Sequence, residues 1–136
     1  MVTKFIVSEY SSGLPNESGR IKVAGGPLYD LARVQAIVEN ENRLLTWTEK
    51  GRKDVFKLFD DDLAAVAGLI QCLKASDYID SEWCENGKNA VAACDAYSIR
   101  RMEVIAATGK AMAVGYFLKF AISKTGKLVL LVSCHV

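Results

Sequence analysis

The sequence has almost no excess charge, only one histidine and no long hydrophobic run. Its 17 Lys and Arg residues against 16 Asp and Glu residues give a net charge of +1 over 136 residues. No overall attraction to nucleic acid follows, so RNA binding requires a local basic patch. Polar residues interrupt the apolar C-terminal part well before the roughly 18 residues that a membrane helix needs. We therefore expect no membrane-spanning helix and a soluble protein.

Cysteine pairs at metal-binding or redox spacing are also missing. The four cysteines are irregularly spaced and form no CxxC motif, and the opening "MVTKFIVSEY" lacks the apolar core of a secretory signal. The expected compartment is the reducing cytoplasm, where the cysteines remain free thiols. Repeats and low-complexity tracts are absent as well.

What is present is enough apolar sequence for one domain. Hydrophobic residues make up 51% of the chain, which at this length supports a single core. Residues 1–27 are rich in turn signals and predict an N-terminal extension or a small hairpin. Residues 28–136 are expected to form the domain itself.

Helical spacing predicts three helices in the first part of this domain. They fall in "PLYDLARVQAIVENEN", in "EKGRKDVFKLF" and in "DDDLAAVAGLIQCLKASD". Pro27 suits the first turn of the first helix, and Thr46 or Thr48 is the expected N-cap of the second. A short strand, "RLLTW", is predicted between the first two helices.

Alternating residues and turn signals predict strands after Asp77. We expect an edge strand in "DYIDSEW", a loop in "CENGKNAVA", and three strands in "CDAYSIRRMEVIA", "AVGYFLKFAIS" and "KLVLLVSCH". Helices followed by hairpins indicate an α+β fold, with N-terminal helices packed on one face of a C-terminal antiparallel sheet. The sheet is expected to lie mainly between Asp95 and His135.

The motifs "YDLARVQAIV", "DDLAAVAGLIQCLKASDYIDS", "CDAYSIR", "YFLKFAI" and "LVLLVSCH" occur in an order that resembles the motility quorum-sensing regulator toxins. These are small mRNA-cleaving endoribonucleases of the RelE/ParE-like fold class. The resemblance covers roughly Tyr29 to His135. It implies a RelE/ParE-like fold, cleavage of single-stranded mRNA, and an antitoxin protein as partner.

The catalytic positions of that family are only partly kept. Asp95, Tyr97, Lys119 and Ser133 match the family's motifs. Asp80 and Cys94 stand where the family has lysine and glutamine, Phe117 stands at its tyrosine with Tyr116 beside it, and His135 stands at its final lysine. The resemblance therefore implies the scaffold more directly than the chemistry.

Candidate site residues follow from what metal-free RNA cleavage requires, namely a base, an acid and donors for the phosphorane. His135 is the candidate acid or base, since an unperturbed imidazole titrates near neutral pH. Tyr97 and Tyr116 are candidate catalytic residues that could stack an unpaired base or donate a hydrogen bond, and we expect His135 to lie beside both. Arg100 or Arg101, with Lys119, is expected to hold the phosphate.

Carboxylates and cysteines have a second interpretation. Asp80 and Asp95 are alternative acid-base groups, although a carboxylate repels phosphate. The run Asp60–Asp62 is explained by helix capping, with magnesium as the alternative, and Cys94, Cys134 and His135 are a weak zinc candidate. We predict neither metal nor cofactor.

Two functions remain open. One is a sequence-selective, metal-independent endoribonuclease. The other is a catalytically silent module of the same fold that binds RNA or a partner protein. Convergence of His135 and an arginine in one cleft would distinguish them.

Overall fold

The helices lie where apolar spacing predicts them, but the expectation that Pro27 lies in the first turn of the first helix is wrong, because that helix begins at Leu31 after its cap Asp30. The computed structural model describes residues 4–14 and 21–136. Asp30, Thr48 and Asp62 each cap a helix through a side-chain oxygen that accepts a backbone N–H. The helical segments in the described residues are α1 (Leu31–Val38), η1 (Glu41–Arg43), α2 (Glu49–Phe59), α3 (Leu63–Cys72) and η2 (Ala75–Asp77). Asp62 thus serves as a cap, as the helix interpretation of the acidic run requires.

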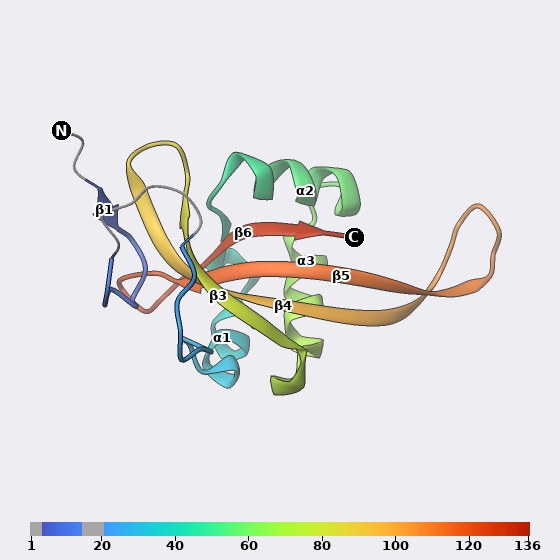
Figure 1. The fold of residues 1–136 in the computed structure, drawn as a ribbon. Helices are drawn as coiled ribbons and strands as arrows, with labels where there is room; N and C mark the ends of the chain where they lie inside the picture. Colours follow the sequence, from blue (N-terminus) through green and yellow to red (C-terminus); the bar gives the residue numbers. More distant parts are fainter. Residues whose placement is uncertain (1–3, 15–20) are drawn as a thin grey trace.

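A single mixed sheet carries the rest of the fold, so the fold is α+β. The described strands are β1 (Phe5–Ile6), β2 (Leu44–Thr46), β3 (Tyr78–Glu85), β4 (Ala90–Val104), β5 (Ala111–Ile122) and β6 (Val129–His135). Their order is β1-β4-β5-β6-β2, with β3 paired to β4 (Figure 1). The four long strands are antiparallel, whereas β1 and β2 are parallel to their neighbours.

The sheet extends further than the expected one. Besides the expected edge strand, which begins at Tyr78, it includes β1 and β2, and most of "CENGKNAVA" belongs to strands because the turn takes only residues 86–89. Gly87 and Asn89 have positive φ there, which lets a short turn close the β3–β4 hairpin. The two parallel strands make the sheet mixed rather than purely antiparallel.

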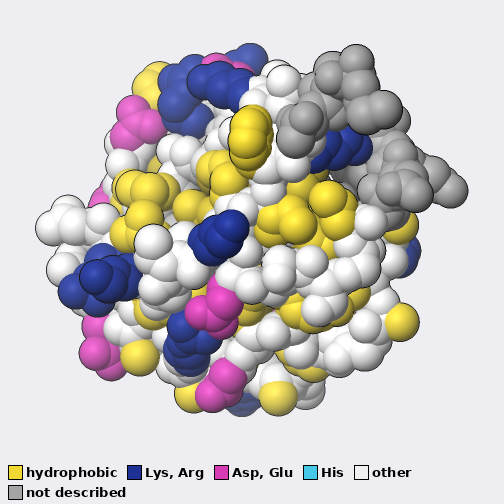
Figure 2. Space-filling model, turned by 90° about the vertical axis from the view of Figure 1, so that its left-hand side faces the viewer, with side chains coloured by type: hydrophobic (Ala, Val, Ile, Leu, Met, Phe, Trp, Pro, Cys, Tyr) yellow, Lys and Arg dark blue, Asp and Glu magenta, His cyan; other side chains and the backbone are white. Residues whose placement is uncertain are grey.

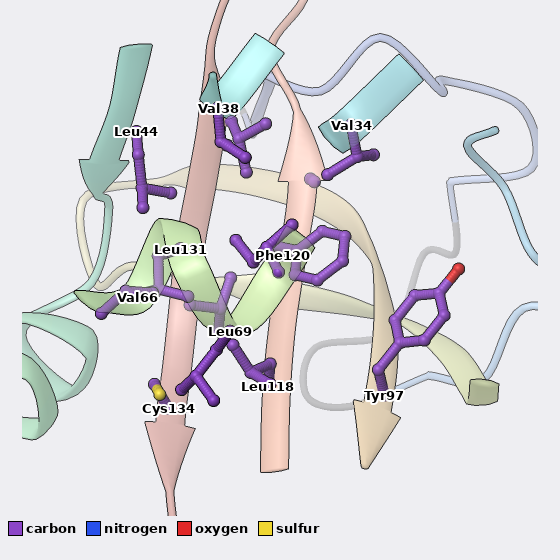
Figure 3. Close-up of a cluster of buried hydrophobic side chains, with 14 of the residues drawn as sticks. Val34, Val38, Leu44, Val66, Leu69, Tyr97, Leu118, Phe120, Leu131 and Cys134 are labelled. Carbon is purple, nitrogen blue, oxygen red and sulfur yellow. The ribbon is translucent and has the colours of Figure 1, made fainter. Parts of the chain in front are cut away.

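The main core lies between the helices and one face of the sheet. Val34 of α1 and Leu69 of α3 pack over the side of β5 that carries Leu118 and Phe120 (Figure 3). Tyr97 of β4 points to this same side and stacks on Phe120 with ring centroids 5.4 Å apart. Among the described residues no helix is both long and apolar enough to cross a membrane.

Helix α2 is attached along β6. The hydroxyl of Thr48 donates to the carbonyl of Val132, and Asp54 accepts the backbone N–H of Cys134 at 3.0 Å. Gly51 permits this approach, since a Cβ there would meet the carbonyl oxygens of Leu131 and Val132 at 3.0 Å. The first turn of α2 is thereby held beside the end of the sheet.

The described part of the N-terminal segment packs on the domain. Phe5 and Ile6 pair with Ala90 and Val91 of β4, and Lys22 bridges to Glu82 of β3. Apolar residues from this segment cover a second small core around Trp83. Residues 4–14 and 21–27 therefore extend the sheet and its cover and, as far as they are described, do not pair with each other.

Candidate functional site

A pocket of about 400 Å³ opens on the sheet face opposite the helix-covered core. Its size falls within the range typical of small-molecule sites. It lies between the start of α2, strand β3, the middle of β5 and the end of β6. The lining residues are Thr48, Lys50, Trp83, Cys84, Glu85, Phe117, Lys119, Val132, Ser133 and His135.

Strand alternation brings the polar residues of this pocket together. Phe117 is paired with His135, and Lys119 is paired with Ser133, in the register of β5 and β6. Residues two apart on a strand share a face, so all four side chains point to the pocket side. The imidazole of His135 stacks on the ring of Phe117, with centroids 4.8 Å apart and planes 23° apart.

Ser133 offers an unused hydroxyl. The residue is only 4% exposed, yet its side chain makes no hydrogen bond to any described residue. Among the described residues, every fully buried side-chain oxygen has a partner, so the Ser133 Oγ must reach the pocket surface. It is therefore available to a ligand as donor or acceptor.

A buried ion pair forms the floor beside Ser133. The ammonium of Lys119 contacts the carboxylate of Glu82, and both residues are almost completely buried. Lys22 reaches the same carboxylate at 3.3 Å and Asp80 at 2.5 Å. Burial alone acts to raise the pKa of Glu82, but the hydrogen bond and charge of Lys119, helped by Lys22, leave it below its usual value.

Helix α2 adds positive potential at the opposite wall. Its first turn meets the pocket at Thr48 and Lys50, where the helix dipole is positive. Lys50 pairs with Asp54 at 2.9 Å, but its side chain is 53% exposed. That ammonium is therefore free to turn toward an anion in the pocket.

The predicted site residues divide between the two faces of the sheet. His135 and Lys119 line the same pocket, but none of the described arginines lines it, so His135 and an arginine do not converge there as the endoribonuclease prediction required. Arg100 lies on their face, since Ser98 pairs with Phe117 and Arg100 follows two residues later. Arg101 lies on the other face, pairs with Glu103 at 2.9 Å and sits 6.0 Å from the ring centre of Tyr116.

The expectation that His135 lies beside Tyr97 and Tyr116 is wrong. His135 does oppose Phe117, but Tyr116 and Tyr97 alternate onto the helix-covered face of the sheet. Both tyrosines are 5% exposed or less. One residue of offset decides this, because adjacent residues on a strand point in opposite directions.

Both tyrosines have structural partners on that face. Tyr97 contacts the ring of Tyr78, and Tyr116 stacks on Phe59 and donates its hydroxyl to Glu103 at 2.7 Å. Burial raises the pKa of each phenol to about 12; in Tyr116 the acceptor Glu103 adds to the effect. Neither phenol is suited to transfer a proton near neutral pH.

We therefore expect Tyr97 to act through packing. Tyr97→Ala should lower the free energy of unfolding by about 3–5 kcal/mol, as for other buried aromatics, whereas Tyr97→Phe should change little. Urea denaturation measures both variants. A Tyr97→Phe protein that folds normally but loses activity would contradict the structural assignment and restore the phenol to the site.

Asp95 and Asp80 are also engaged in the scaffold. The Asp95 carboxylate accepts hydrogen bonds from the backbone of Leu28 and Tyr29 and from the hydroxyl of Ser81. Burial raises its pKa, while these donors act against the rise. Asp95 thus anchors the segment that leads into α1.

The cysteines remain as free thiols, with Cys72 exposed and the other three buried. Burial raises the pKa of Cys94 well above its usual value and that of Cys134 to about 12. Within residues 4–14 and 21–136, no group of three or more His, Cys, Asp or Glu side chains is placed to hold a metal.

Sequence reasoning missed several residues of this pocket. The i, i+2 spacing of Phe117 with Lys119, and of Ser133 with His135, was a signal for one shared face. Glu82 and the start of α2 carried no such signal, because they reach the pocket from distant parts of the chain.

Basic, acidic and hydrophobic side chains mix on the end of the molecule that carries β1, and no histidine is visible there (Figure 2).

The family remains a prediction that rests on the ordered motifs. The α+β fold and the pocket geometry are compatible with many functions. Comparison of the chain with protein-family models, with curated proteins and with solved structures gives no significant match.

Proposed function

We propose that this chain is a metal-independent endoribonuclease of a toxin-antitoxin module, which cleaves single-stranded mRNA in the pocket described above. The observation that carries the proposal is the convergence of His135, Ser133 and Lys119 on one pocket. These residues supply a titratable imidazole, an unused hydroxyl and a cation within one site. The motif resemblance supports the same reaction class.

In the proposed reaction, the 2′-hydroxyl of the RNA attacks the adjacent phosphorus and the 5′-oxygen leaves. His135 transfers one of the two protons, and Glu85 is a candidate for the other because it also belongs to the pocket lining. Lys50, the first turn of α2 and the Ser133 hydroxyl stabilise the phosphorane. The exposed ring surface of the Phe117–His135 stack gives an unpaired base a place to stack.

Arg100 extends the binding surface. It lies on the pocket face of β4, one row beyond Ser98, and it is exposed. A guanidinium there can bind the phosphate of a neighbouring nucleotide through paired hydrogen bonds. We assign Arg100 rather than Arg101 to RNA binding because Arg101 faces the other side.

The silent module is the second candidate, and one contact favours it. Glu82 already neutralises Lys119, so this cation has less charge left for a phosphorane. Asp80 and Cys94, at the positions where the resemblance implies lysine and glutamine, point in the same direction. Such a module would bind RNA in the pocket without cleaving it.

The remaining family properties are part of the same proposal. They are a RelE/ParE-like arrangement of the fold, a cytoplasmic location and an antitoxin protein that binds the toxin.

A cleavage assay on purified protein tests the proposal. A single-stranded RNA of mixed sequence, labelled at its 5′ end, is incubated with the protein in excess EDTA. We expect discrete fragments that end in 2′,3′-cyclic phosphate, because the attacking group is the 2′-hydroxyl. Binding of the RNA without cleavage would assign the chain to the silent module, and neither binding nor cleavage would reject both functions.

A further inference from the structure

The distal half of the β4–β5 hairpin projects beyond the body of the protein (Figure 1). Strand β3 pairs with β4 only as far as Tyr97, and β6 pairs with β5 only as far as Phe117. Beyond these pairs, the two strands contact each other as a ribbon. Met102, Val104 and Met112 on this ribbon are 68%, 71% and 52% exposed.

Such a ribbon is an unusual feature in water. Isolated two-stranded ribbons are marginally stable, and exposed apolar strand edges tend to pair with another strand. In the described residues, the outer edge of β4 from residue 98 to 104 has no strand beside it. This edge is therefore a candidate interface.

The backbone groups on that edge can be identified from the register. The N–H of Ile105 donates to the carbonyl of Lys110, so odd-numbered residues of this part of β4 direct their backbone groups toward β5. The even-numbered residues Arg100, Met102 and Val104 direct theirs outward. Their N–H and C=O groups are available to a further antiparallel strand.

The charged side chains on this edge of β4, at Arg101 and Glu103, have a self-complementary pattern. Arg101 and Glu103 lie on one face, on either side of Met102. In an antiparallel pair of identical strands related by a twofold axis at Met102, Arg101 of each copy lies opposite Glu103 of the other copy. Moving the axis to either neighbouring residue places Arg101 opposite Arg101, or Glu103 opposite Glu103, which is unfavourable.

We propose that the outer edge of β4 pairs with the same edge of a second copy of this chain, antiparallel about a twofold axis at Met102. The outward backbone groups at Arg100, Met102 and Val104 then form the inter-chain ladder. Met102 packs against Met102 of the second copy, and Val104 against the aliphatic stem of Arg100. The pairing is isologous, so it closes as a dimer instead of growing into a fibre.

This register also fits the neighbouring structure. Val104 of the second copy lies opposite Arg100, and β3 begins only opposite Tyr97. The incoming strand therefore ends before it reaches β3. The pocket with His135 lies away from this edge, whereas Arg100 belongs both to the proposed RNA-binding surface and to the dimer edge. Variants at Arg101 and Glu103 leave Arg100 and His135 in place, so loss of the dimer can be distinguished from loss of RNA cleavage.

Charge reversal at this edge tests the register directly. Arg101→Glu places two acidic residues opposite each other, and Glu103→Arg places two basic residues opposite each other. Each variant alone should weaken the dimer roughly tenfold or more in sedimentation equilibrium, since both pairs in the dimer become repulsive. Mixing the two variants should restore association as a heterodimer, because the two acidic side chains of one variant then lie opposite the two basic side chains of the other.

Two controls separate this result from a general loss of structure. Lys110→Glu reverses a charge at the ribbon turn, and Tyr116→Phe removes the internal hydrogen bond to Glu103; both should leave the dimer unchanged. A wild-type protein that is monomeric at its highest soluble concentration would overturn the proposal. So would mixed variants that remain monomeric although each is folded by circular dichroism.

Discussion

His135→Ala protein is expected to cleave single-stranded RNA about 10²- to 10⁴-fold more slowly than the wild type, the range for removal of a general acid or base. The imidazole lines the pocket and stacks on Phe117, next to the unpartnered hydroxyl of Ser133. Its loss removes a proton-transfer group without opening the core. Initial rates on the labelled RNA, measured with EDTA present, check the expectation.

Stability and chemical rescue make this result specific. His135 is the last residue of β6 and only partly buried, so the alanine variant should keep the wild-type melting temperature within a few degrees. Added imidazole should restore part of the rate if the side chain transfers a proton. Lys124→Ala, in the turn at the far end of the β5–β6 hairpin, is the matched control and should cleave normally. Equal rates with and without His135 would remove this residue from the mechanism.

Glu82→Gln should lower the free energy of unfolding by about 3 kcal/mol, because it leaves the buried ammonium of Lys119 without its carboxylate. Lys119→Met should lower the free energy of unfolding by less, since the Glu82 carboxylate still has the ammonium of Lys22 at 3.3 Å. The double variant, with both charges removed, should be more stable than Glu82→Gln alone. Urea denaturation at pH 7 gives all three values.

The matched control for the ion pair is Glu85→Gln. Glu85 is on the same strand and pairs with Lys4, but its side chain is 39% exposed. Exposed ion pairs contribute less than about 1 kcal/mol, so this variant should be close to the wild type in stability. A similar loss from Glu82→Gln and Glu85→Gln would show that the buried pair has no special role.

The ion pair of Glu82 and Lys119 also predicts how the free energy of unfolding depends on pH. The pKa of Glu82 is lowered in the folded protein from its usual value of 4.5, so its ionised form stabilises the fold above that pH. This contribution is lost as the pH falls through the lowered pKa. The difference in unfolding free energy between the wild type and Glu82→Gln should therefore shrink below about pH 4.5. A constant difference from pH 7 to pH 3 would contradict the assignment.

Local sequence patterns predicted most of the helices and strands of this fold, although not the strand content of "CENGKNAVA". Apolar spacing and caps located the three helices, as Asp62 shows for α3. The turns at Lys124–Gly126 and residues 105–110 followed from glycine and lysine between alternating stretches. These features depend on nearest neighbours in the chain, which is why they could be read without the structure.

The site was only partly predictable. The predicted hairpin placed His135 near Gly115 to Phe117, where it does pair with Phe117, but did not assign the tyrosines to the correct face. In a strand, an error of one residue exchanges the two faces, so Tyr97 and Tyr116 were placed in the site although they pack in the core. Side chains on a strand alternate between two faces, so assigning a residue to a face requires the exact pairing register. Only the folded structure gives this register.

The sequence by itself determined the α+β composition, the approximate positions of the three helices and the pairs of residues that share a face along each strand. The tertiary structure decided what these faces meet: Glu82 beneath Lys119, the first turn of α2 beside Ser133, and the parallel strands β1 and β2 at the sheet. The physical reason is the separation along the chain. Local preferences act between residues a few positions apart, whereas these contacts join distant segments and form only when the core brings them together.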